Sequence, residues 1–140
     1  MHTRIQGPWI VCGDFNNILG YDERIGSVVT EVDIKRFLEC TQTCDLADIS
    51  AHGVFFTWSN KQDGDGRRFS SVDRVLVNME WLMLFPDCTS TFLPEGLFDH
   101  NPCVIDLWRT SEGRKRLIKY FNVWGRYEKF SDIICSGLAA

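Results

Sequence analysis

A carboxylate and an amide follow directly after an apolar run near the start of the chain. Trp9–Gly13 is that run, and Asp14 and Asn16 come after it with Phe15 between them. In extended backbone, residues i and i+2 point to the same side, so Asp14 and Asn16 would face one way and Phe15 the other. Such a pair offers a general base or metal ligand beside a hydrogen-bond donor. Asp and Asn also favour turns, so a plain turn is the alternative.

A second pair of candidates, Asp99 and His100, lies in a loop just before the apolar segment Cys103–Trp108. An adjacent carboxylate and imidazole can serve one metal ion or one phosphate from two directions. The alternative is a loop histidine that is structural or merely exposed.

Asp73 is the third candidate, because it stands inside the apolar segment Arg68–Val77. A carboxylate in a buried strand is costly unless it is paired or hydrogen-bonded. Holding an imidazole in one tautomer would satisfy that demand. The alternative is a position that faces solvent, paired with Arg68 or Arg74.

Three blocks, in chain order, resemble the endonuclease/exonuclease/phosphatase superfamily, whose members include DNase I-like and abasic-site endonucleases. They are Gly13–Asn16, Asp73–Val77 and Asp99–Pro102.

Longer segments around these blocks, Pro8–Asn16, Phe56–Asn60 and Val72–Asn78, are similar to endonuclease domains of plant non-LTR (LINE-type) retrotransposons. The segment Lys119–Trp124, followed by Phe130, resembles the connection from such an endonuclease to a reverse transcriptase.

The resemblance implies hydrolysis of a DNA phosphodiester bond with Mg²⁺ as cofactor, leaving a nick. Asp14 would orient or deprotonate the attacking water, and Asn16 would hydrogen-bond the scissile phosphate. Asp99 would help to hold the metal or the water, which makes Asp14 and Asp99 the expected metal ligands. His100 would contact the phosphate as acid or base, and Asp73 would orient it.

Two residues near a predicted hairpin tip, Trp58 and Asn60, are expected to contact DNA. Core packing and turn formation are the alternatives for both.

Two features depart from the family. Phe98 stands where the family usually has a small Ser before the Asp–His pair. The family also places an Asn and a metal-binding Glu on earlier strands, and the few residues before the Gly13–Asn16 block do not match them. We therefore expect an α+β fold that is the C-terminal half of a four-layer α/β sandwich, two packed β-sheets flanked by helices.

On these grounds the expected function is that of a truncated endonuclease domain, weak or inactive alone, with the missing N-terminal half and DNA as its partners. A non-catalytic half-domain that binds protein or nucleic acid is an alternative function. A phosphatase of the same superfamily is another.

Composition and charge agree with two parts of unequal character. Residues 1–108 carry 8 Lys and Arg against 16 Asp and Glu, whereas residues 109–140 carry 7 against 3. We expect a partial endonuclease domain over 1–108 and a basic, aromatic linker segment over 109–140. The acidic part does not suit a protein that grips nucleic acid through phosphate contacts alone.

No apolar run approaches the roughly 20 residues of a membrane span, so no membrane partner is expected. The N-terminus lacks the apolar core of a signal peptide, which predicts an intracellular protein, nuclear or cytoplasmic and not secreted. The six cysteines are expected to be reduced and mostly buried.

Apolar periodicity and breakers predict the elements that must position these residues. A helix over Glu31–Cys44 has Thr30 as its N-cap, and a short helix over Asn78–Phe85 ends at Pro86. The predicted strands are Trp9–Gly13, buried on both faces, the hairpin Val54–Ser59 with Arg68–Val77, and the later strands Thr89–Leu93 and Cys103–Trp108.

Overall fold

The computed structural model describes residues 6–107. The predictions for 109–140, Trp108 and Cys135 therefore lie outside the described residues. The strands are β1 (Ile10–Asp14), β2 (Arg24–Ile25), β3 (Ala47–Asp48), β4 (Ser50–Gly53), β5 (Trp58–Ser59), β6 (Phe69–Ser70), β7 (Asp73–Val77), β8 (Thr89–Phe92) and β9 (Cys103–Asp106). The helices are α1 (Glu31–Thr43) and α2 (Met79–Leu84), and the 3-10 turns are η1 (Tyr21–Glu23) and η2 (Gly64–Gly66). The fold class is α+β, as predicted.

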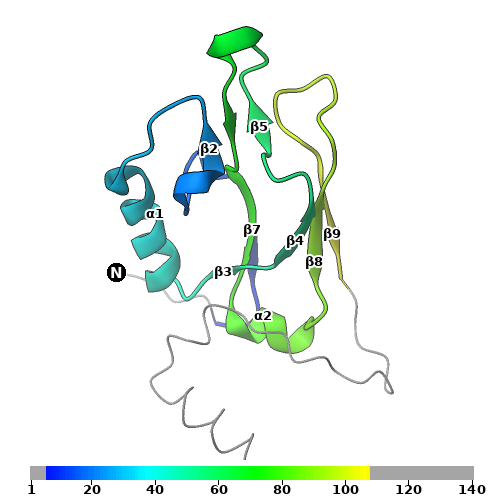
Figure 1. The fold of residues 1–140 in the computed structure, drawn as a ribbon. Coiled ribbons are helices and arrows are strands. Elements are labelled where there is room, and N and C mark those ends of the chain that lie inside the picture. The colour runs from blue at the N-terminus through cyan, green and yellow to red at the C-terminus, as the bar shows by residue number, and fades with distance from the viewer. Residues whose placement is uncertain (1–5, 108–140) are drawn as a thin grey trace, which may run out of the picture. The chain divides into compact units, whose positions relative to one another are not determined.

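Three small sheets share the strands, in the orders β1-β7-β3, β2-β6-β5 and β4-β8-β9. All pairs are antiparallel except β4 with β8. Figure 1 shows β7 running through the middle, with the tip of the β5–β6 hairpin and the loop between β8 and β9 at one end. The helix α2 lies at the other end of β7, so the hairpin tip and the loop between β8 and β9 share the end away from α2.

The predicted first helix is confirmed as α1. Thr30 and Asp33 cap its start, since the backbone N–H and the hydroxyl of Thr30 both donate to Asp33 Oδ2, at 2.8 and 2.7 Å. Its apolar stripe packs on the sheet, where Phe37 forms a buried cluster with Leu46 and Leu76. Burying an aromatic or leucine side chain of this kind contributes about 1.5–3 kcal/mol.

The predicted second helix is confirmed as α2. The side chain of Asn78 accepts a hydrogen bond from the backbone N–H of Trp81 at 3.1 Å, which caps the helix. The same oxygen accepts from the backbone N–H of Trp9 at 3.0 Å. One buried amide thus fixes the helix start against the beginning of β1.

The predicted hairpin is only partly right. Its second strand is two strands in two sheets, since β6 pairs with β2 and β5 whereas β7 pairs with β1 and β3. The first strand is confined to Trp58–Ser59, because Val54–Thr57 is irregular. Between β6 and β7, the Thr57 hydroxyl accepts the backbone N–H groups of Val72 and Asp73 at 3.1 and 3.0 Å. A side-chain oxygen therefore replaces ladder carbonyls where the chain changes sheets.

The predicted burial of the first strand was wrong, although the strand itself is confirmed as β1. Cys12, Gly13 and Asp14 are exposed. Among the described residues β1 pairs only with β7 and is an edge strand. The cysteine prediction was also wrong in part. Of the five described cysteines only Cys88 is buried, whereas Cys12, Cys40, Cys44 and Cys103 are exposed.

No helix within residues 6–107 has the length and apolar character needed to cross a membrane.

A buried arginine joins the central strand to two other segments. Arg74 is 8% exposed and bonds Asp48 Oδ2 through Nη1 at 2.8 Å and Glu23 Oε2 through Nη2. Its guanidinium carbon also lies 6.0 Å from the ring centre of Phe37. The Glu23 side chain is itself only 16% exposed, so the arginine neutralises a carboxylate that water reaches poorly.

We predict that Arg74→Met lowers the free energy of unfolding by about 3 kcal/mol, because it leaves the Glu23 carboxylate largely buried without its cation. Urea denaturation measures this difference. Arg36→Met is the matched control, since Arg36 is exposed on α1. An equal loss of stability in the two variants would contradict the prediction.

Candidate active site

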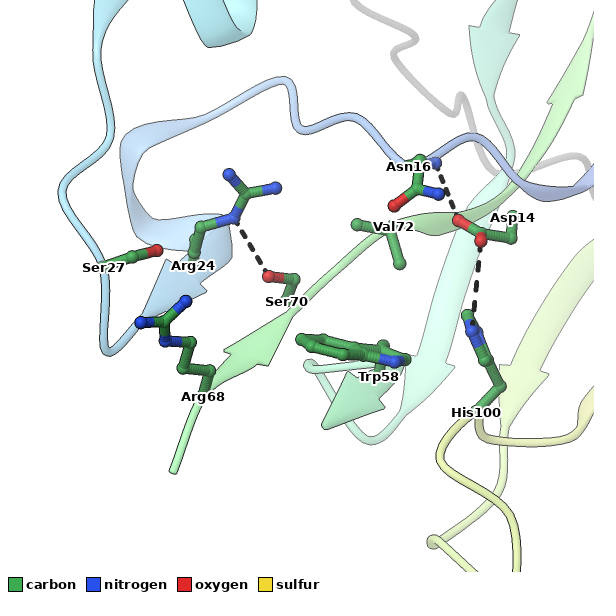
Figure 2. A pocket seen from close by; sticks show the side chains of 9 residues that line it. All are labelled: Asp14, Asn16, Arg24, Ser27, Trp58, Arg68, Ser70, Val72 and His100. Carbon is green, nitrogen blue, oxygen red and sulfur yellow. Dashed lines mark hydrogen bonds and ion pairs between the residues drawn. The ribbon is translucent and has the colours of Figure 1, made fainter. Parts of the chain in front are cut away.

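A pocket of about 420 Å³ lies where β1, β5 and β6 meet the loop before β9. Figure 2 shows Asp14, Asn16 and His100 at one end of it and Arg24 and Arg68 at the other, with the ring of Trp58 between them. The volume is in the range of about 300–1,000 Å³ that is typical of small-molecule sites. The residues that line it are Asp14, Asn16, Arg24, Ser27, Trp58, Arg68, Ser70, Val72 and His100.

His100 lies between two carboxylates that come from neighbouring strands. Its Nδ1 is 2.9 Å from Asp73 Oδ2 and 3.2 Å from Asp73 Oδ1. Its Nε2 is 3.9 Å from Asp14 Oδ2, which is too far for a hydrogen bond. Asp73 thus accepts a hydrogen bond from Nδ1–H, and Nε2 is left to act on a ligand atom near Asp14.

Burial lowers the pKa of His100, but the hydrogen bond and charge of Asp73, with the charges of Asp14 and Asp99, outweigh it and raise the pKa above its ordinary value. The imidazolium is therefore populated further toward neutral pH than in a free histidine. A cation that is held in place beside a pocket can bind a phosphate oxygen or donate a proton to one.

The strand register places the two carboxylates together. Asp14 at the end of β1 is directly opposite Asp73 at the start of β7. Opposed residues in an antiparallel pair point to the same face of the sheet. The Asp73 side chain is 15% exposed, and its backbone N–H is fixed by the Thr57 hydroxyl.

Asn16 is held by its own turn. Its backbone N–H donates to Asp14 Oδ1 at 2.7 Å, and its φ of 54° is in the left-handed region that Asn tolerates better than most residues. Asp14 and Asn16 thus form a turn and also line the pocket.

The side chain of Asp99 is hydrogen-bonded to Trp58. Trp58 Nε1 donates to Asp99 Oδ2 at 3.2 Å, and the backbone N–H of Ser59 donates to the Asp99 carbonyl at 3.0 Å. The hydrogen bond from Trp58 is the main cause of the lowered pKa of Asp99. Trp58 also forms a β-bridge with His100, so β5 positions both members of the Asp–His pair.

Asn60 serves the hairpin and does not line the pocket. Its Nδ2 donates to the Gly66 carbonyl at 2.9 Å, and its Oδ1 accepts the backbone N–H of Arg68 at 2.9 Å. These two contacts close the loop that contains η2.

Glu95 holds the loop between β8 and β9 against the hairpin, a role that was not predicted. It accepts hydrogen bonds from the Ser59 hydroxyl at 3.1 Å, from Lys61 Nζ at 2.9 Å and from Arg67 Nη2 at 3.0 Å. The contacts with Lys61 and Ser59 are the main causes of its lowered pKa. The segment that precedes Asp99 is therefore tied down.

The sequence analysis also missed Arg24, Arg68 and Thr57. Thr57 carries no local signal, because its hydroxyl acts on backbone fifteen and sixteen residues away. Arg24 and Arg68 are brought into one pocket by the pairing of β2 with β6, which are only two residues long. Such short strands leave no periodicity to detect.

The described residues do not by themselves fit a Mg²⁺ centre. Within residues 6–107 no group of three or more His, Cys, Asp or Glu side chains is placed to hold a metal ion. Of the two expected ligands, Asp99 is engaged with Trp58 and Asp14 with the backbone of Asn16. Magnesium demands near-octahedral oxygen coordination, which these two carboxylates alone do not supply.

We predict that NMR titration of the full chain gives His100 a pKa above about 6.5. Asp73→Asn should lower that pKa, because burial then acts with fewer opposing charges. Glu39→Gln, an exposed change on α1, should leave it unchanged. A His100 pKa that is equal in wild type and Asp73→Asn would show that the pair does not form.

We also predict a pH dependence of stability with a definite sign. Because the His100 pKa is raised by folding, its contacts stabilise the fold fully below the unfolded value of about 6.5 and cease to do so as pH rises through the folded pKa. The difference in unfolding free energy between wild type and His100→Gln should therefore be larger at pH 6 than at pH 9. Thermal or urea unfolding at the two values measures it, and a difference that grows with pH would contradict the assignment.

Comparison with known proteins adds no relative: no protein-family model, curated protein or solved structure matched this chain.

Proposed function

We propose that this chain contributes the phosphate-binding and proton-transferring part of a Mg²⁺-dependent DNA endonuclease, of the retrotransposon type that its motifs resemble. The observation that supports this best is the Asp73–His100–Asp14 arrangement at one end of a pocket. It joins three residues that are far apart in the sequence and that the resemblance assigns to one reaction.

The chemistry follows from the two sides of the imidazole. Nδ1 faces Asp73, which holds the ring and its tautomer. Nε2 and Asp14 Oδ2, 3.9 Å apart, can both contact one water molecule, and Nε2 can also donate to a phosphate oxygen. In this arrangement Asp14 accepts a proton from water, the Asn16 amide hydrogen-bonds the phosphate, and the His100 imidazolium stabilises the charge that develops on it.

We expect weak nuclease activity from residues 6–107 alone. Mg²⁺ usually binds one or two carboxylates together with waters and substrate phosphates, and the two carboxylates expected here are already engaged in other hydrogen bonds, so they hold it weakly on their own. We also propose that the described sheets form one half of a four-layer α/β sandwich. The open edge of β1 and its exposed residues Cys12 and Asp14 are what such a half would present to the other.

A non-catalytic nucleic-acid-binding module is the second candidate function. It is favoured by the lack of a three-donor metal group among the described residues, since phosphate binding at His100 needs no metal. Both candidate functions include binding of nucleic acid, and only the first includes its cleavage.

We predict slow, Mg²⁺-dependent nicking of supercoiled plasmid by the full chain. His100→Gln and Asp14→Asn should each reduce it by roughly 100-fold or more, to background, because general acid–base groups contribute about that much. Glu39→Gln is the control that should retain the wild-type rate. Gel separation of supercoiled and open-circular plasmid measures the rate.

The outcomes separate the candidates. Nicking that persists in His100→Gln contradicts the proposed site. DNA binding that depends on His100, without any nicking, favours the non-catalytic module. Hydrolysis of an inositol phosphate without nicking would replace DNA by a small phosphorylated substrate.

A further inference from the structure

Two arginines line the pocket end away from His100, and neither forms an ion pair within residues 6–107, although the charge of Arg24 helps to lower the pKa of Asp33. Arg67 and Arg74 form ion pairs with Glu95 and Glu23, whereas Arg24 and Arg68 form none within the described part of the chain. An arginine pair that faces a pocket and has no ion pair of its own is suited to an anionic ligand.

The small sheet β2-β6-β5 presents these arginines on one face with an aromatic ring. Ser70 of β6 is paired with Arg24 on one side and with Trp58 on the other, so the three side chains lie in a row across the sheet. Arg68 is two residues before Ser70 and points to the same face. All four residues line the pocket, as Figure 2 shows.

Local hydrogen bonds fix the side chains of Arg24 and Trp58 and the backbone of Arg68 before any ligand binds. Arg24 Nε donates to the Ser70 hydroxyl at 3.1 Å, and the backbone N–H of Arg68 donates to Asn60 Oδ1 at 2.9 Å. The Trp58 ring is held by the bond from its Nε1 to Asp99. Groups that are already ordered lose less entropy on binding, so they add more to affinity.

We propose that this face is a subsite for a second phosphate of a polynucleotide strand, bound by Arg24 and Arg68, with a base or sugar resting on Trp58. The inference rests on the proposed function, which assigns the first phosphate to His100 and Asn16. Two anion-binding ends with an aromatic ring between them match the alternation of phosphate and base along a strand. A monophosphate ester would leave the arginine end unused.

The test compares a ligand that reaches both ends with a ligand that reaches one. Binding of a short fluorescein-labelled single-stranded DNA to the full chain is measured by anisotropy over a series of salt concentrations. Binding of inorganic phosphate is measured by the NMR shift of the His100 ring. Arg24→Gln and Arg68→Gln are the test variants, and Arg36→Gln on the exposed side of α1 is the charge-matched control.

Each test variant should weaken DNA binding by roughly 3- to 10-fold relative to Arg36→Gln and should lower the salt dependence by about one phosphate contact. Phosphate binding at His100 should stay unchanged. Arg24→Lys retains the charge and should recover part of the DNA affinity, which separates charge from a folding defect at the Ser70 contact.

The outcomes distinguish a failure of the second subsite from a failure of the proposed function. DNA affinity that is equal in Arg24→Gln, Arg68→Gln and Arg36→Gln overturns the second subsite, whatever happens at His100. A His100 ring that does not respond to phosphate overturns the proposed function. An inositol polyphosphate that binds in an arginine-dependent way, when the oligonucleotide does not, overturns the assignment to a polynucleotide.

Discussion

The rest of the structure depends on the burial of one positive charge, the guanidinium of Arg74. A cation in the interior needs anionic partners, and Arg74 finds them in Glu23 and Asp48, from segments on either side of α1 in the sequence. Glu23 also accepts the backbone N–H of Leu19 at 2.6 Å, so the same carboxylate orders the loop after β1. Because Arg24 follows Glu23, the ion pair between Glu23 and Arg74 also fixes the backbone position of the arginine at one end of the pocket. Because Asp73 precedes Arg74, the same ion pair fixes the backbone position of Asp73, whose carboxylate holds His100.

The alternation of β7 explains how one strand serves both structure and site. Successive side chains of a strand point to opposite faces, so Arg74 is directed toward α1 and Asp73 toward His100. This works only if the strand begins at Asp73. The Thr57 hydroxyl ensures that, because it accepts the N–H groups of Val72 and Asp73 where β6 ends and β7 begins. A continuous strand from Arg68 to Val77 would keep these residues in one sheet and would not bring β6 beside β2.

The sequence could predict elements whose signal is local, and it failed where the signal is distant. The α1 helix is specified by the Thr30–Asp33 cap and by an apolar stripe, and α2 by Asn78. The break between β6 and β7 depends on a hydroxyl fifteen residues away, and the exposure of β1 depends on which strand lies beside it. Asp14, Asp73 and His100 were singled out by their residue types beside or within apolar segments and by the resemblance of their three blocks to one superfamily. Arg24, Arg68 and Glu95 were not, because charged residues in polar loops are ordinary and only strand pairing and the loop contacts give them a role.

Phosphate recognition and metal binding have different requirements, and the described residues meet them unequally. On the proposed function, recognition needs fixed donors and cations, and these would be Asn16, His100 and the arginine pair, with the side chains of His100 and Arg24 held by hydrogen bonds and the backbones of Asn16 and Arg68 fixed by theirs. A metal centre needs several oxygen ligands converging on one point, and the carboxylates here are divided among His100, Trp58 and backbone amides. Affinity for a phosphate chain can therefore persist where turnover is weak, because the groups that bind are supported by local hydrogen bonds. On the proposed function, oxygen ligands that raise turnover would approach the open side of Asp14, where β1 has no strand beside it among the described residues.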